Sequence, residues 1–81
     1  FHAEWCGPCS AQDDIIDEVE EQFDIEVERI DVDEQQDMAN DYNVRGIPFI
    51  VIEVDGVIDA SFQGLTQFSE IEDALKTIRN A

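Results

Sequence analysis

The sequence predicts an α/β fold, a sandwich of three layers in which a mixed central sheet of about four strands has helices on both faces. Segments with helical spacing of apolar residues alternate with short β-branched runs, in the order β-α-β-α-β-β-α. Right-handed crossovers between parallel strands then bring helices to both faces of the sheet. No linker, repeat or low-complexity tract interrupts the chain, so residues 1–81 are expected to form a single domain.

Residues 1–4 are expected to end a strand that leads into the first helix. From Pro8 to Phe23, apolar residues recur on one helical stripe and acidic residues fill the other faces. Both cysteines of the chain, Cys6 and Cys9, fall where this strand gives way to its helix. Open α/β sheets build their sites at that end of the strands.

The middle of the chain is expected to hold a strand and a short helix. Residues 25–32 contain β-branched residues with partial alternation and are predicted to form the strand. Asp33 is predicted to cap the helix that follows. In that helix Met38, Ala39 and Tyr42 share one face.

The last third of the chain predicts a hairpin and a final helix. Residues 49–54 form a nearly unbroken apolar run, as expected for a strand covered on both faces. Asp55-Gly56 predicts a two-residue hairpin turn, and residues 57–62 return as a strand. Thr66 is predicted to cap the final helix. Its apolar stripe contains Phe68, Ile71, Leu75 and Ile78.

Charge is the unusual feature of the composition. Twenty-one acidic residues face four basic ones, which gives a formal net charge of −17. Nucleic acid is excluded as a partner because phosphate binding needs clustered Lys and Arg, and an anionic membrane surface would repel the chain. In molar salt the Debye length falls to about 3 Å, so the acidic groups stop repelling one another. We therefore expect a halophilic source, a fold that loosens in dilute buffer, and activity that rises with salt.

Cys6 and Cys9 are two residues apart, a spacing that lets two thiols close into a small disulfide ring and reopen while carrying two electrons. Pro8 suits the first turn of a helix, where its missing N–H is not needed. The N–H groups of that turn would favour a thiolate at Cys6, and the thiolate is the form that attacks disulfides.

The cysteine pair has two alternative roles that stay open at the level of sequence. A structural zinc site needs four ligands, and the chain offers two cysteines and one histidine, although a cluster shared between two chains would complete the set. A purely structural disulfide is the second alternative, and it is less expected because no other cysteine and no secretory signal is present. We expect no metal.

Several motifs, spread in order over nearly all 81 residues, resemble the thioredoxin family. They are Ala3-Glu4-Trp5-Cys6-Gly7-Pro8-Cys9, Asp31-Val32-Asp33, Tyr42-Asn43-Val44-Arg45-Gly46-Ile47-Pro48, Asp55-Gly56 and Gly64. The resemblance implies a thioredoxin-like fold that lacks the extra N-terminal strand and helix of full-length members. Most of the first strand is also missing, so the chain is expected to be clipped upstream or to be a compact member.

The resemblance implies reduction of protein disulfides by dithiol exchange and a role in cell redox homeostasis. By it, Cys6 is the exposed nucleophile, and Cys9, which is less accessible, resolves the mixed disulfide. No cofactor is implied beyond the redox-active Cys6–Cys9 disulfide. The implied partners are disulfide-bearing proteins and an electron donor of the thioredoxin-reductase type, and the chain is expected to be a cytoplasmic monomer. A Gly-Pro insert implies a reducing couple, near the thioredoxin value of about −270 mV.

The resemblance also assigns substrate-binding residues. Pro48 would carry a cis peptide that places the Ile47 backbone beside Cys6, where it pairs with an extended substrate segment. An apolar patch would surround the sulfur atoms. It comprises Trp5, Gly7, Pro8, Ile47, Pro48 and Gly64.

The chain departs from the family pattern at several positions. The buried aspartate of the family would fall just before Phe1, and Ser10 replaces the basic residue that commonly follows the second cysteine. His2 stands where the family usually has an aromatic residue. Arg29 aligns with a strand lysine of the family and keeps its charge, but it does not shuttle protons. His2 and Arg29 are therefore expected to modulate the site.

Other activities on the same scaffold stay open. An oxidase or isomerase would show a redox potential well above the thioredoxin range. A glutaredoxin-like role would need a basic residue near Cys6 to hold the carboxylates of glutathione, and the sequence offers none there. A non-catalytic adaptor or cluster carrier would bind zinc or iron, or would carry thiols that do not react with disulfides.

Overall fold

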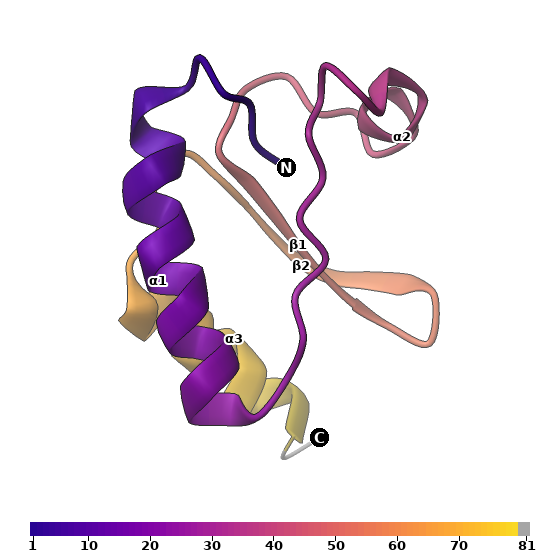
Figure 1. The fold of residues 1–81 in the computed structure, drawn as a ribbon. Coiled ribbons are helices and arrows are strands. Elements are labelled where there is room, and N and C mark those ends of the chain that lie inside the picture. Colours follow the sequence, from indigo (N-terminus) through magenta and orange to yellow (C-terminus); the bar gives the residue numbers. More distant parts are fainter. Residues whose placement is uncertain (80–81) are drawn as a thin grey trace.

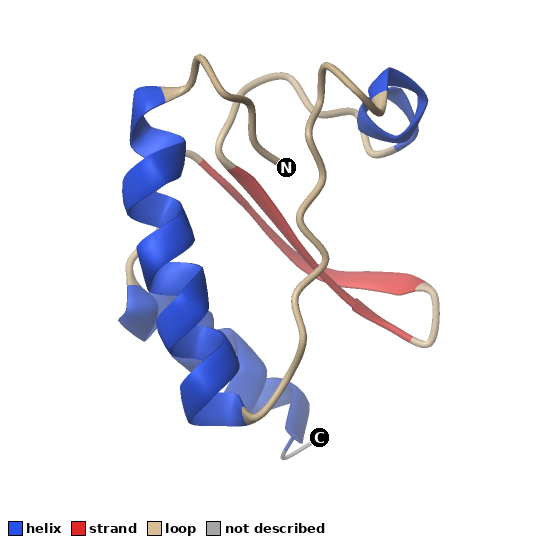
Figure 2. Cartoon of the chain, in the orientation of Figure 1, coloured by secondary structure: helices blue, strands red, loops and turns tan. Residues whose placement is uncertain are grey.

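The computed structural model describes residues 1–79, in which helices and strands follow in the order α1-α2-β1-β2-α3 (Figure 1). Their bounds are Gly7–Phe23 for α1, Gln36–Asp41 for α2, Phe49–Val54 for β1, Val57–Gln63 for β2 and Phe68–Arg79 for α3. Helices α1 and α3 pack together, and α2 lies on the opposite side of the β1–β2 hairpin from α1 (Figure 2). The predicted α/β class with helices on both sides is confirmed.

Helix α1 forms the core with α3. The predicted apolar stripe turns inward, and Ile16, Val19 and Phe23 pack with Ile71 of α3. Val19 is 1 % exposed, and full burial of such a side chain stabilises the fold by about 1.5–3 kcal/mol. The helix ends at Phe23, and the next residue, Asp24, has a left-handed φ of 52° and donates its N–H to the Glu20 carbonyl in the last turn. One helix thus provides both the core and, at its other end, the cysteines.

The hairpin forms at the predicted turn. Asp55 and Gly56 have φ of 54° and 80°, and this pair of positive values matches the right-handed twist of the strands that they join. Strand β1 has the predicted bounds, and β2 extends to Gln63. The prediction that β1 is covered on both faces is wrong: the strand is half-buried to Ile52 and exposed beyond, and its residues line a groove.

The strand predicted over residues 25–32 does not form. This segment is extended, but only His2 pairs with it, through a parallel bridge to Asp31 and backbone bonds of 2.9 Å to Ile30 and Val32. Further back, the Val27 N–H donates to the Glu20 carboxylate instead of to a strand. A ladder needs a neighbouring segment that pairs along its length, and among residues 1–79 only His2 pairs with this segment. Within residues 1–79 the sheet therefore has two strands, not about four.

Residue Phe1 nevertheless shows the mixed strand directions expected of the sheet. It exchanges backbone hydrogen bonds of 2.8 and 3.2 Å with Phe49, an antiparallel pairing, while its neighbour His2 is parallel to Asp31. Phe1 also stacks at a tilt on the rings of Tyr42 and Phe49. The segment before the cysteines is thus held between the 30–32 segment and β1.

Both predicted helix caps are wrong. Asp33 does not cap α2, because the helix begins only at Gln36 and the Asp33 carboxylate instead accepts from the Trp5 indole N–H. The Thr66 hydroxyl donates to the Gly64 carbonyl, and α3 begins two residues later at Phe68, so Thr66 does not occupy the cap position. At the start of α3, the Glu70 carboxylate accepts from the Gln67 N–H at 3.0 Å, which is one half of a capping box.

Candidate active site

Cys6 and Cys9 are joined by a disulfide at the start of α1. Cys6 is the residue just before the helix, Cys9 lies in its first turn, and their Cα atoms are 5.4 Å apart. Cys6 is 8 % exposed and Cys9 6 %, so in the disulfide form the predicted contrast between an exposed and a covered cysteine is small. The two cysteines thus form a closed disulfide ring just beneath the surface.

The electrostatics of this helix end favour a negative charge on Cys6. The first turn of α1 contains no acidic residue, and no side chain caps it. Its N–H groups therefore remain available to stabilise a thiolate, as the positive end of the helix dipole does. Acidic side chains begin only at Asp13, two turns into the helix.

The loop before β1 lies against the disulfide. The Ile47–Pro48 peptide bond is cis, as expected, and Ile47 packs against the cluster of Ala3, Cys6 and Cys9. The Pro48 carbonyl accepts from the Gly64 N–H at 2.8 Å. The structure therefore brings together the cysteines, the 46–48 loop and the 64–66 loop, which are far apart in the sequence.

Trp5 stands at the open side of this site. It is 68 % exposed, so it is not the half-buried residue that a core role would require, and its indole N–H donates to the Asp33 carboxylate at 2.7 Å. Pro8 and Gly7 are exposed beside it, and nothing lies within 4 Å of where a Cβ on Gly7 would stand. Trp5, Gly7 and Pro8 therefore form an exposed apolar surface on one side of the disulfide, and acidic residues lie beside Trp5. Asp33 was not among the predicted site residues, and its place in Asp31-Val32-Asp33 was the available signal.

Gln12 is a second residue that sequence reasoning missed. It is 4 % exposed and lies one turn after Cys9 on the buried face of α1. Its amide accepts from the Thr66 N–H at 2.7 Å and donates to the Thr66 carbonyl at 3.0 Å. A polar residue on an otherwise apolar helical stripe was the signal that could have identified it.

Arg29, a predicted modulator, lies in an ion-pair cluster. Its guanidinium contacts Asp13 at 2.6 Å, Asp17 at 2.7 Å and Glu20 at 2.9 Å, all on α1. Hydrogen bonds to Asp13 and Glu20 raise the pKa of Arg29. The Val27 N–H, and after it Arg29, lowers the pKa of Glu20. This cluster attaches the segment before the parallel bridge to the helix that carries the cysteines.

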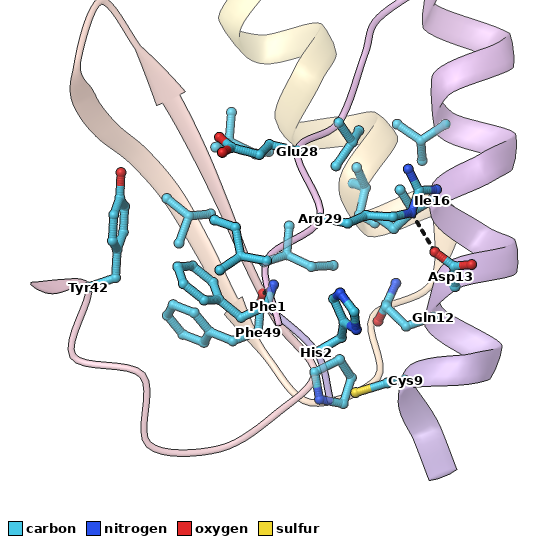
Figure 3. A pocket seen from close by; sticks show the side chains of 18 of the residues that line it. Phe1, His2, Cys9, Gln12, Asp13, Ile16, Glu28, Arg29, Tyr42 and Phe49 are labelled. Atoms are coloured by element: carbon cyan, nitrogen blue, oxygen red, sulfur yellow. Dashed lines mark hydrogen bonds and ion pairs between the residues drawn. The ribbon is translucent and has the colours of Figure 1, made fainter. Parts of the chain in front are cut away.

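A groove of about 910 Å³ lies between residues 25–30 and β1, and Figure 3 shows His2, Gln12 and Cys9 near one another in it. Trp5, Gly7 and Ile47 do not line it. Of the predicted substrate patch, Pro48 lines the groove, whereas Pro8 and Gly64, like the three residues just named, do not. His2, the other predicted modulator, is half-buried and lines the groove.

The described part of the chain shows neither a metal centre nor a membrane-spanning helix. No three His, Cys, Asp or Glu side chains among residues 1–79 are arranged to hold a metal ion. Among the same residues, no helix has both the length and the apolar character to span a membrane.

Comparison with known proteins gives concordant matches. The sequence profile described as thioredoxin matches residues 1–77. A thioredoxin of Pseudomonas aeruginosa is 36 % identical over 73 residues, which cover 88 % of this chain and 68 % of that protein. A thioredoxin of Mycoplasmoides gallisepticum is 31 % identical over 77 residues, with 94 % and 77 % covered.

Two solved structures share the fold. A point mutant of the thioredoxin from Halobacterium salinarum NRC-1 has a TM-score of 0.89 and 38 % identity, and the match covers 95 % of this chain and 68 % of the other. A malarial protein has a TM-score of 0.87 over 95 % of this chain and 89 % of its own, at 20 % identity, a likeness in fold alone.

Proposed function

Because the chain belongs to the thioredoxin family and is a thiol–disulfide oxidoreductase, we propose that it works as a reductase of protein disulfides. The observation that carries this proposal is the Cys6–Cys9 disulfide at an uncapped, acid-free helix N-terminus, with Ile47 packed against it. The Gly7-Pro8 insert between the cysteines supports the reducing direction, because the family's couple with that insert is strongly reducing, at about −270 mV.

The reaction proceeds by two exchanges in which electrons balance. In the reduced protein the Cys6 thiolate attacks one sulfur of a substrate disulfide, so that a mixed disulfide forms and the first substrate thiolate leaves with the bonding pair. Cys9 then loses its proton to solvent, and its sulfur attacks the Cys6 sulfur. The Cys6–Cys9 disulfide forms and the second substrate thiolate leaves. Two electrons have moved from the dithiol to the substrate, and both leaving thiolates take protons from water.

The surface around the disulfide suits a peptide rather than a small molecule. Trp5 and Gly7 are open to solvent, and Ile47 is half-buried beside the sulfur atoms. An extended substrate segment would pair with the Ile47 backbone and lie between Trp5 and Gly64. Oxidised protein is recharged by a donor of the thioredoxin-reductase type. We place this cycle in the cytoplasm, with the protein acting as a monomer and without a metal or other cofactor.

Substitution of each cysteine tests the assignment of roles. Cys6→Ser abolishes reduction of insulin disulfides, because the thiolate that attacks the substrate disulfide is lost. Cys9→Ser accumulates a mixed disulfide with Cys6, detectable by mass under non-reducing conditions, because nothing resolves it. Full insulin reduction by Cys6→Ser would end the proposal. A redox potential far above the thioredoxin range, measured in high salt on protein checked for zinc and iron, would assign an oxidase or isomerase instead.

The acidic composition leads us to place the working conditions in high salt. At −17 the carboxylates repel one another, and molar KCl screens that repulsion beyond about 3 Å. The rate of insulin reduction should therefore rise between dilute buffer and molar KCl. A flat profile over that range would refute the halophilic assignment and leave the disulfide chemistry untouched.

A further inference from the structure

Gln12 is a buried polar side chain on the face of α1 that otherwise faces the core. It is 4 % exposed, and the other buried residues of that face are Cys9, Ile16, Val19 and Phe23. A buried amide costs free energy unless both its donor and its acceptor are used. At this position an apolar residue would pack without that requirement, so the partners of the amide indicate its purpose.

Both partners of the amide belong to the backbone of Thr66. The Thr66 N–H donates to Gln12 Oε1 at 2.7 Å, and Gln12 Nε2 donates to the Thr66 carbonyl at 3.0 Å. Thr66 is 3 % exposed, so both bonds are buried. Two bonds to one peptide residue fix the orientation of the 64–66 loop relative to α1 as well as its position.

The same loop continues into the substrate side of the site. The Thr66 hydroxyl donates to the Gly64 carbonyl at 3.0 Å, and the Gly64 N–H donates to the Pro48 carbonyl at 2.8 Å. Ile47, next to Pro48, packs against the cysteines. A chain of hydrogen bonds therefore runs from Gln12, one turn after Cys9, through the 64–66 loop to the loop that faces the disulfide.

We infer that Gln12 is a positioning residue for the protein-substrate surface, and this inference rests on the proposed disulfide exchange. Gln12 fixes the position of Gly64 relative to the Cys6 sulfur, so that a bound peptide segment contacts both. Gln12 itself does not take part in the exchange of sulfur bonds. Its loss should therefore weaken the binding of protein substrates and leave the reaction of the sulfur atoms unchanged.

The variant Gln12→Met tests this, because methionine has nearly the same length and neither of the two hydrogen bonds. The KM for insulin should rise about three- to tenfold, the effect of about one neutral hydrogen bond. The kcat should be unchanged. So should the rate with 5,5′-dithiobis(2-nitrobenzoate), a small disulfide that needs no loop contact, and the rate of Cys6 alkylation by iodoacetamide.

Val19→Ala is the matched control, because Val19 lies on the same face of α1 but packs in the core cluster with α3. It should lower stability and leave the KM for insulin unchanged. The inference would be overturned if Gln12→Met and Val19→Ala had the same KM for insulin. It would also be overturned if Gln12→Met slowed the reaction with the small disulfide as much as the reaction with insulin. If Gln12→Met does not fold, Gln12→Leu, which also removes both hydrogen bonds to Thr66, carries the test by the same comparison. Activity retained in Cys6→Ser would instead overturn the proposed function, so the two failures are distinguishable.

Discussion

Gly64 and Gly56 offer a matched pair of substitutions that separates folding from function. Both have a positive φ, +87° and +80°, and in both nothing lies within 4 Å of where a Cβ would stand. Gly64 bonds to the Pro48 carbonyl next to the cysteines, whereas Gly56 lies at the tip of the hairpin. Replacing each with alanine therefore imposes the same backbone strain at two places, only one of which is near the site.

The expected loss of stability is similar for Gly64→Ala and Gly56→Ala. An L-residue in the left-handed region costs about 1–2 kcal/mol. Alanine also lowers the conformational entropy of the unfolded chain, which stabilises the folded state by about 0.4–1 kcal/mol. The net loss is about 1 kcal/mol, which for a chain of this size lowers the Tm by about 4–8 °C. No steric clash adds to it, because the space around each Cβ is open.

The two variants should differ in activity. Gly64→Ala shifts the backbone that bonds to Pro48 and adds a methyl group to the substrate surface, so insulin reduction should slow by about fivefold or more. Gly56→Ala should reduce insulin at the parent rate. Thermal unfolding in molar KCl and the insulin assay measure the two quantities. Equal activities would remove Gly64 from the substrate surface, and a Tm loss several times larger in one variant would refute the estimate from φ alone.

Three further predictions concern individual charges. The Tyr42 hydroxyl donates to the Glu53 carboxylate, which raises the Tyr42 pKa above its ordinary 10.0. The absorbance of this single tyrosine at 295 nm should therefore rise at a higher pH than that of a free tyrosine, and Glu53→Gln should restore the ordinary value. The stabilisation from this contact is present below pH 10.0 and is lost as the pH rises through the higher pKa of the folded state. Arg29→Met should destabilise the fold by about 1–2 kcal/mol in dilute buffer and by less in molar KCl, since its ion pairs are partly exposed and screened, and an equal loss in both buffers would contradict this. Ser10→Glu adds a carboxylate to the first part of α1, so it should stabilise the helix slightly and yet slow iodoacetamide alkylation of Cys6 by about two- to fivefold relative to Ser10→Gln.

The sequence predicted the elements whose signals are local. Apolar periodicity or turn residues within the segment itself predict three elements: the helical stripe from Ile15 to Phe23, the strand from Phe49 to Val54 and the Asp55-Gly56 turn. The structure forms all three at or near the predicted residues. The cysteine pair was recognisable for the same reason, because its chemistry depends on four adjacent residues.

Predictions that depended on a distant partner were the ones that failed. Residues 25–32 have strand-forming residues, but a ladder forms only where a neighbour runs alongside, and His2 provides that for one bridge alone. The caps failed because α2 begins only at Gln36 and α3 at Phe68, so neither Asp33 nor Thr66 is the residue just before its helix. No pattern in the chain states which of several nearby side chains reaches a given N–H.

Gln12 and Asp33 were missed for a related reason. Each acts through a residue far along the chain, Gln12 through Thr66 and Asp33 through Trp5. A glutamine in a helix rich in acidic residues resembles an ordinary surface residue until the apolar stripe is drawn and Gln12 falls between Cys9 and Ile16. Polar residues at apolar positions of a helix that carries catalytic groups therefore merit the same attention as the catalytic motif.

The distribution of charge along α1 reconciles a strongly acidic protein with a reactive thiolate. Residues 7–12 carry no carboxylate, and the acidic residues of the helix begin at Asp13. Three of those carboxylates contact Arg29, so part of the nearest negative charge is neutralised locally. The helix N–H groups next to Cys6 act on it over a short range that salt screens little, whereas the distant carboxylates act over lengths that molar salt screens almost completely. Salt therefore removes the influence that opposes the thiolate and leaves the one that favours it.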